Sequence, residues 1–162
     1  MTVRLARPAD LPALVAVLNA AVAKGQNALL EPVTVEDRAR WLDAHAPEAY
    51  PLWVASGGDG VAGWCSLSPW RAGRGALAGT AEVSVYVAPV HQRRGVGTLL
   101  LRHAIRRAPE AGVDRLLAIG LETNAASLAL FTREGFARWG ALPGVAVFGA
   151  DRVGQWIAGR AV

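Results

Sequence analysis

The stretch "VSVYVAPVHQRRGVGTLLLRHAIRRA", residues Val83 to Ala108, decides the fold. Apolar and polar residues alternate in its first part, which predicts a strand that stops at Pro89, because proline cannot extend a strand ladder. Apolar residues at helical spacing follow, and they predict a helix from Val96 to Ala108. Gly95 and Gly97 lie where the two patterns meet, so a strand passes through a glycine-containing turn directly into a helix.

This turn has the composition of an anion-binding site. Glycines at positions 95 and 97 leave the first backbone N–H groups of the helix free of blocking side chains, and those groups attract anions. Arg93 and Arg94 add positive charge beside them. The turn lacks the Gly-Lys-Ser/Thr of a P-loop and the third glycine of the dinucleotide fingerprint. Gln92-x-x-Gly95-x-Gly97 therefore predicts a pyrophosphate cradle, with a plain tight turn as the alternative.

Length and composition limit the class of protein. With 162 residues, of which 52% are hydrophobic and 19% are charged, residues 1–162 are expected to form one packed domain. The net charge of +4 suits either an anionic partner or a solvated basic surface. No segment has transmembrane length and no recognition helix is evident, so neither a membrane nor a nucleic acid is expected as a partner.

Cys65 is the only cysteine of the chain, which excludes an intrachain disulfide. This fits a reducing compartment and predicts a cytoplasmic protein. Because the residue lies in the apolar run "VAGWCSL", a buried structural thiol is expected rather than a nucleophile. The sequence indicates no metal site.

Further strands and helices are expected on both sides of the central unit. Asp10 predicts the N-cap of a first helix, and Thr34 with Asp37 predicts a capping box for a second. Gly135 is expected in the left-handed conformation that ends the last helix. The expected elements are strands at 2–6, 80–88 and 115–122, helices at 10–23, 96–108 and 124–134 and another starting at Thr34, a hairpin at 51–70, a glycine-rich loop at 71–79 and a terminal antiparallel pair. This order predicts an α+β, or mixed α/β, fold.

Several segments resemble a known family. "HQRRGVGTLLL" resembles the acetyl-CoA pyrophosphate loop of the GNAT superfamily of N-acetyltransferases, and "ETNAASLALFTREGF" resembles a later helix of that superfamily. "TAEVSVYVAP", "LEPVTVEDRARWL" and "SPWRAGRG" are similar to its phosphinothricin and methionine sulfoximine acetyltransferase branch. The resemblance covers nearly the whole chain. It implies a mostly antiparallel twisted sheet of about six to seven strands flanked by four helices.

The resemblance implies that acetyl-CoA donates an acetyl group to a primary amine that attacks it directly. An exposed strand edge at Val85–Val87 can hydrogen-bond the amides of pantetheine as a further strand would. Asn124 and Ser127, at a helix start, are expected to hold another part of the cofactor, and Asn124 is also a plain N-cap candidate. The candidate cofactor-binding residues are Val85, Tyr86, Val87, Gln92, Arg93, Arg94, Gly95, Val96, Gly97, Thr98, Asn124 and Ser127.

Glu82 is the candidate general base. It shares one strand face with Ser84 and Tyr86, and burial or an ordered water would make a carboxylate effective at neutral pH. The alternative is an ordinary acid at a strand end. The resemblance also implies a tyrosine that protonates the leaving thiolate, but this chain has Phe131 at that position. Tyr86 and solvent are then the candidate donors, and a thiolate that leaves unprotonated is the alternative.

Arg71 and Arg74, in the glycine-rich loop, are the candidate substrate-binding residues. A guanidinium there can hold a carboxylate bidentately, which predicts a small, amino-acid-like amine as the substrate. The alternative is a pair of solvated loop arginines. Two other functions stay open: an acetyltransferase for a protein N-terminus or another macromolecular amine, and a non-catalytic acyl-CoA-binding sensor. A homodimer is a further candidate assembly.

Overall fold

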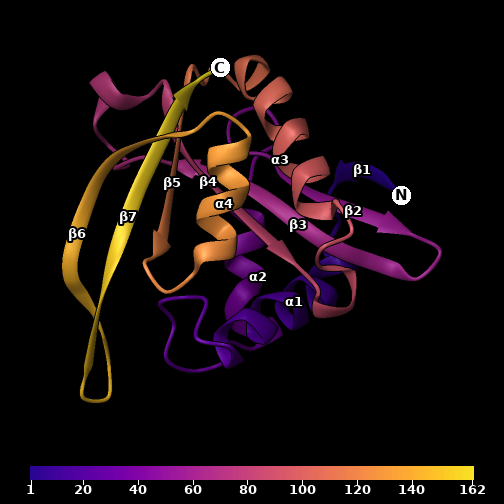
Figure 1. The fold of residues 1–162 in the computed structure, drawn as a ribbon. Helices are drawn as coiled ribbons and strands as arrows, with labels where there is room; N and C mark the ends of the chain where they lie inside the picture. Colours follow the sequence, from indigo (N-terminus) through magenta and orange to yellow (C-terminus); the bar gives the residue numbers. More distant parts are fainter.

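The computed structural model describes residues 1–162 and contains one seven-stranded sheet, in the order β1-β2-β3-β4-β5-β7-β6 (Figure 1). Only the β4–β5 pair is parallel, so the expected mixed, mostly antiparallel sheet is confirmed. The strands are β1 (Thr2–Leu5), β2 (Leu52–Gly57), β3 (Gly60–Pro69), β4 (Thr80–Val87), β5 (Arg115–Leu121), β6 (Ala137–Phe148) and β7 (Asp151–Ala161). The helices are α1 (Leu11–Ala23), α2 (Val35–Asp43), α3 (Val96–Arg107) and α4 (Ala125–Arg133).

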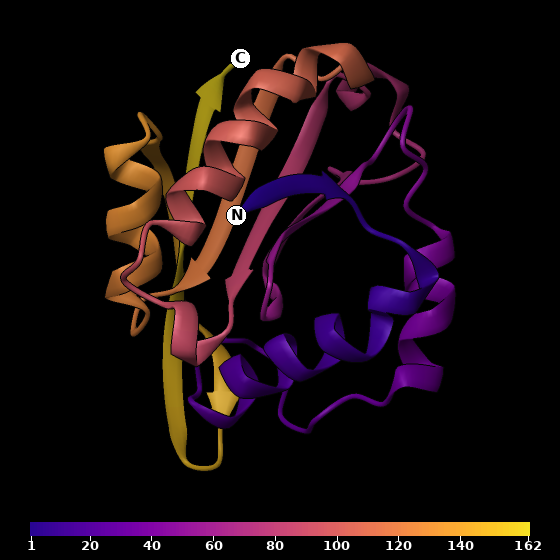
Figure 2. The ribbon, with the colours of Figure 1, turned by 90° about the vertical axis from the view of Figure 1, so that its right-hand side faces the viewer.

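The helices cover both faces of the sheet. Helices α3 and α4 lie on one face, and α1 and α2 lie on the other (Figures 1 and 2). Strand β2 contributes to both layers, because Trp53 and Ala55 join the core under α3 whereas Leu52 and Val54 join the core under α1. Two apolar layers therefore hold the central strands fixed. Cys65 lies in the first layer, fully buried as the sequence predicts, and burial raises the pKa of its thiol.

The starts of the first two helices differ from each other. Helix α2 begins with the predicted capping box, in which Asp37 N–H donates to Thr34 Oγ1 over 3.1 Å and Thr34 N–H donates to Asp37 Oδ2 over 3.1 Å. Asp10, in contrast, caps no N–H group of α1. It lies in a short 3-10 turn, Pro8–Asp10, that precedes the helix.

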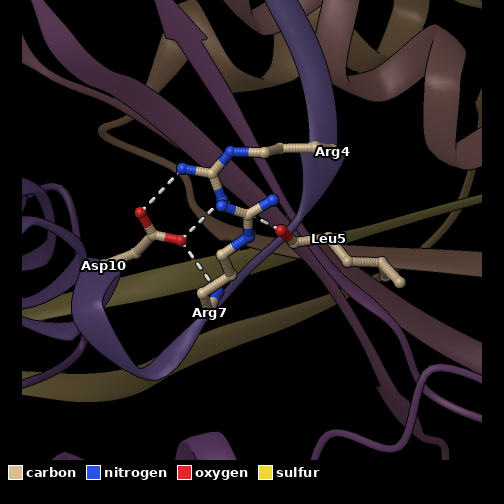
Figure 3. Close-up of polar contacts among 4 residues, drawn as sticks. All are labelled: Arg4, Leu5, Arg7 and Asp10. Carbon is tan, nitrogen blue, oxygen red and sulfur yellow. Dashed lines mark hydrogen bonds and ion pairs between the residues drawn. The ribbon is translucent and has the colours of Figure 1, made fainter.

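The carboxylate of Asp10 instead fastens β1 to this turn (Figure 3). Arg4 donates to its two oxygens over 2.7 and 2.8 Å, and Arg7 N–H donates to Oδ2 over 2.8 Å. The hydrogen bonds from Arg4 lower the pKa of Asp10. Asp10 does occupy the predicted N-cap position of α1, but its side chain makes no capping bond, because a bidentate guanidinium is a stronger partner for a carboxylate than a helix N–H group.

The feature that positions the functional site is the separation of β4 from β5. The parallel pairing covers Thr80 to Glu82 on β4 and ends at the pair Glu82–Leu117. Beyond it the two strands diverge toward their carboxyl ends (Figure 1). A gap therefore opens in the middle of the sheet.

A tryptophan side chain from β7 donates a hydrogen bond to the backbone carbonyl of β5 that faces this gap. Glu122 N–H bonds Gly154 O on the β7 side, so by alternation the carbonyl of Leu121 points toward β4. The indole Nε1 of Trp156 donates to that carbonyl over 3.1 Å. Its ring crosses β5 at Gly120, where a Cβ would lie only 2.2 Å from the indole. The missing side chain at position 120 thus makes room for the indole, which bonds the carbonyl that β4 leaves unpaired.

No helix of the structure combines the length and the apolar character that crossing a membrane requires.

Candidate functional site

The unpaired edge of β4 forms one wall of the site. Ala88 N–H bonds Ala62 O and Thr80 O accepts from Trp70 N–H, so the even-numbered residues of β4 direct their backbone groups to β3. The backbone groups of Val85 and Val87 then face the gap, beyond the last pair with β5. Gln92 Nε2 donates to Val87 O over 3.1 Å, which closes the carboxyl end of this edge. An extended amide chain can form hydrogen bonds with the backbone groups of this edge that are still unpaired.

The turn before α3 has the backbone that the glycine pattern predicts. Gly95 adopts φ +82° immediately before the helix, and Arg93 adopts φ +60°, a conformation that non-glycine residues rarely take. The first N–H groups of α3 therefore open onto the same gap as the β4 edge. A helix N-terminus of this kind suits a phosphate.

Gly97 serves packing as well as access to the helix N-terminus. A Cβ at this position would lie 3.2 Å from Leu130 Cδ2 and 3.6 Å from Val87 Cγ2. The glycine therefore allows α3 to approach both α4 and β4 closely. The sequence pattern predicts only phosphate access at this glycine, because a local motif does not show the neighbouring helix.

These elements enclose a cavity of about 670 Å³, a size typical of small-molecule sites, which we call the cradle cavity. It contains every predicted cofactor-binding residue except Arg94. Its lining residues are Ala21, Gln26, Val85, Tyr86, Val87, Gln92, Arg93, Gly95, Val96, Gly97, Thr98, Asn124, Ala126, Ser127, Leu130 and Arg133. The turn, the strand edge and the start of α4 thus meet in one place, as the sequence-based hypothesis requires.

Asn124 links the cradle cavity to the loop that follows α1. Its Oδ1 accepts from Ser127 N–H over 3.1 Å, which makes it the N-cap of α4. Its Nδ2 donates to Gln26 O over 3.3 Å. Across the cavity, Arg133 donates to Thr98 Oγ1 over 3.3 Å and joins α4 to α3.

A second cavity, of about 330 Å³, contains Glu82 and is called here the acid cavity. Burial raises the pKa of Glu82, so this carboxylate is a stronger base than a solvated one. The lining residues are Gln26, Asn27, Ala28, Glu82, Tyr86, Ile119, Gly120, Leu121 and Gln155. Gln26 and Tyr86 line both cavities and so form the boundary between them.

Tyr86 is held firmly at this boundary. Its ring lies 4.5 Å from the ring of Trp64, whose indole N–H donates to Leu14 O of α1 over 3.1 Å. Asn27 Nδ2 donates to Tyr86 Oη over 2.5 Å. Burial is the main cause that raises the pKa of Tyr86; the Asn27 hydrogen bond lowers that pKa, and the nearby Glu82 charge raises it.

The remaining predicted residues lie outside the cavities. Arg71 and Arg74 are exposed in the loop after β3 and line neither cavity. Phe131 is buried and packs edge-on against Phe136, so α4 presents no hydroxyl there. Gln26 and Asn27 are functional candidates that sequence reasoning missed, because the loop after α1 carries no motif.

Comparison with known proteins identifies the family. The profile of the acetyltransferase (GNAT) family matches residues 19–136. The chain belongs to this family. The GNAT relatives include YwnH of Bacillus subtilis (strain 168), which is 43% identical over 162 residues, or 99% of this chain and 98% of the relative.

Two further GNAT relatives bear on the chemistry. The L-methionine sulfoximine/L-methionine sulfone acetyltransferase of Pseudomonas paraeruginosa is 37% identical over 96% of this chain and 89% of its own. The protein yncA of Salmonella typhimurium, solved with its cofactor acetyl-CoA, superimposes with a TM-score of 0.92 at 30% identity over 99% of this chain and 93% of that one.

Acetyl-CoA is the acetyl donor of this GNAT enzyme, and the cradle cavity fits it. An unpaired strand edge suits the pantetheine amides, and the glycine turn at the start of α3 suits the pyrophosphate. Arg93 supplies a cation at the same cavity. No group of three or more His, Cys, Asp or Glu side chains is arranged to hold a metal ion.

Proposed function

We propose that this protein transfers an acetyl group from acetyl-CoA to the primary amine of a small, amino-acid-like substrate. The observation that carries the proposal is the junction of two cavities at Tyr86, with the strand edge and helix N-terminus on one side and Glu82 on the other. The Pseudomonas relative acts on two amino acids, according to its name, which supports the substrate class.

The cradle cavity would hold the donor. Val85 and Val87 offer backbone groups to the pantetheine amides, whereas Arg93 and the N–H groups at the start of α3 serve the pyrophosphate. The N-cap Asn124 and the next turn of α4, with Ser127, border the same cavity. Bound there, acetyl-CoA supplies the acetyl group as an activated thioester.

The acid cavity would hold the amine. Glu82 takes the proton that the nitrogen loses when its bond to the acetyl carbon forms, directly or through one water. Its raised pKa brings the carboxylate nearer to the pH at which the enzyme works. The acid cavity has no second carboxylate among its lining residues, so this proton-accepting role falls to Glu82.

Tyr86 would act on the sulfur side of the boundary. When the bond between carbon and sulfur breaks, its electron pair stays on the sulfur, and the phenol O–H donates a hydrogen bond to the charge that develops there. Tyr86 keeps its proton in this step, because burial raises its pKa from the usual value of a phenol, which already exceeds that of an ordinary thiol. The hydroxyl that α4 lacks at Phe131 is thus supplied from β4.

We further propose that Arg71 and Arg74 bind the substrate carboxylate. The support is positional: their loop starts directly after Pro69, and the preceding Ser68 is the β3 partner of Glu82. Both side chains are exposed and free of hydrogen bonds to the protein, so both are available to an anion.

The test is an acetyl-transfer assay on the purified protein. A panel of amino acids, amino acid sulfones, polyamines and short peptides is incubated with acetyl-CoA while thiol release and the acetylated product are followed. Turnover is expected with α-amino acids. Turnover with peptides alone would support the macromolecular alternative, and tight acetyl-CoA binding without any turnover would support the sensor alternative.

We also propose that residues 1–162 act as one cytoplasmic acetyltransferase domain that forms a homodimer. Strands from both ends of the chain share one sheet, and the only cysteine is free and buried. Four exposed apolar side chains gather on the edge strand β6, which supports self-association there. They are Trp139, Leu142, Val145 and Val147.

A further inference from the structure

The loop after α1 reaches both sides of the site through two consecutive residues. Gln26 accepts from Asn124 Nδ2 at the cradle cavity, and Asn27 donates to Tyr86 Oη at the acid cavity. The same loop is fastened farther along by Asn19 of α1, which exchanges two hydrogen bonds with the backbone of Val33. Nothing in the catalytic scheme above requires an asparagine at position 27.

The orientation of the Asn27 amide follows from its two neighbours. Its Oδ1 accepts from Leu29 N–H over 2.7 Å, and a backbone N–H can only donate. The other end of the amide, Nδ2, therefore faces Tyr86, and it too can only donate. The phenol oxygen must be the acceptor in this contact, although a phenol can serve in either role.

This contact decides where the phenol proton points. Because the lone pair of Oη is directed at Asn27, the O–H bond must take another direction, and the ring cannot move away since it packs on Trp64. Tyr86 lines both cavities, so the open directions lead to their boundary. The charged groups that influence this hydroxyl are Glu82 and Arg38.

We propose that Asn27 is a positioning residue that orients the Tyr86 hydroxyl, so that its proton is directed at the boundary where the acyl group changes partner. This inference rests on the proposed function for its catalytic consequence, but its geometric content concerns the protein alone. The amide N–H also favours partial negative charge on the phenol oxygen, which strengthens Tyr86 as a donor. Asn27 lines the acid cavity, but in this role it acts through Tyr86 and not on the reacting atoms.

The decisive variant is Asn27→Asp, which keeps the shape and the bond to Leu29 N–H but replaces the donor with an acceptor. The carboxylate then accepts a hydrogen bond from the phenol O–H, so the proton points at residue 27 and not at the boundary. The matched control is Asn19→Asp, which makes the same chemical change in the anchor of the same loop without touching Tyr86. Asn27→Ala serves as a second variant, which removes the donor without adding a charge.

The first readout requires neither acetyl-CoA nor the amine substrate. The chain has two tyrosines, so a Tyr50→Phe background leaves Tyr86 as the only phenol to titrate. Asn27→Asp and Asn27→Ala are expected to raise the pKa of Tyr86, and Asn19→Asp is expected to leave it unchanged. An unchanged Tyr86 titration in both Asn27 variants overturns the inference, whatever reaction the enzyme catalyses.

The second readout is a double-mutant cycle on kcat. Asn27→Asp is expected to lower kcat roughly tenfold, about the effect of one hydrogen bond, with little change in the KM for acetyl-CoA. In a Tyr86→Phe background the same change should cost nothing further, because the group on which Asn27 acts is gone. If the two losses of kcat multiply in the double variant, or if Asn19→Asp loses as much kcat as Asn27→Asp, the effect is a general one of the loop and the inference is refuted. Absence of turnover in the wild type would refute the proposed function alone, because the titration still decides the geometry.

Discussion

Glu82 is the only carboxylate that lines either cavity, so the proton transfer depends on this residue. We expect Glu82→Gln to lower kcat at pH 7 by roughly a hundredfold, in the range of one lost general base, with acetyl-CoA affinity unchanged. Burial raises the pKa of Glu82 from its ordinary value. The wild-type kcat/KM should therefore fall as the pH drops through this raised pKa, because the carboxylate gains a proton and can no longer act as a base.

The pH profile of kcat/KM checks this expectation. Glu82→Gln should lack the acidic limb and recover part of its activity at high pH, where more of the amine is already neutral. Glu36→Gln, a change of an exposed acid on α2, is the control and should keep the wild-type profile. An unchanged profile in Glu82→Gln would make Glu82 a structural acid.

Arginine substitutions test how the substrate carboxylate is bound. We expect Arg71→Ala or Arg74→Ala to raise the KM for an amino acid by roughly tenfold to a hundredfold, as loss of a charge-assisted hydrogen bond implies, and to leave acetyl-CoA binding unchanged. Arg38 is the competing cation, because its charge lowers the pKa of Tyr86 and it lies over the Trp41 ring at 5.5 Å. A KM effect confined to Arg38→Ala would move the carboxylate site from the glycine-rich loop to α2.

At the scale of elements, variants of two helix caps can distinguish an effect on fold stability from an effect on ligand binding. Asn124 caps α4 at the cradle cavity, whereas Thr34 caps α2 away from both cavities. Either residue changed to alanine should cost about 1 kcal/mol of unfolding free energy, as lost N-caps usually do. Only Asn124→Ala should also weaken acetyl-CoA binding, because it loses the bond to Gln26 as well. Urea melts measure the stability, and calorimetric titrations measure the acetyl-CoA affinity. An equal acetyl-CoA affinity in both variants would show that Asn124 does not contribute to binding.

Local patterns predicted the elements well where a short-range rule governs them. The capping box at Thr34, the left-handed Gly135 after α4 and the alternating strand before Pro89 all depend on neighbours within four residues. Asp10 takes the predicted N-cap position, but the predicted capping bond is missing, because its carboxylate pairs with Arg4 on another element. Asn27 went unnoticed for the same kind of reason, since its partner Tyr86 is distant in sequence.

The shape of the whole site was the least predictable feature. Strands β4 and β5 both read as ordinary buried strands, and nothing in either segment states that their pairing ends at Glu82. The separation is sustained by Trp156, which crosses β5 at Gly120 and satisfies the carbonyl of Leu121. A contact among three segments of the sheet cannot be read from the pattern of one. The exposed edge at Val85–Val87 was predicted, but the gap between β4 and β5 that exposes it was not.

Binding of the donor should stabilise the whole molecule, because the cradle cavity is assembled from β4, α3 and α4 and exists only in the folded state. At a hundred times its Kd, acetyl-CoA adds about 2.7 kcal/mol to the unfolding free energy, which corresponds to a rise in Tm of about 5–10 °C for a chain of this size. Pantetheine, which lacks the pyrophosphate, should give a much smaller rise. Arg93 lines the cavity and Arg94 does not, so Arg93→Ala should reduce the shift more than Arg94→Ala. Thermal melts with calorimetry measure this, and a protein that neither shifts nor binds would contradict the assignment of the cradle cavity to acetyl-CoA.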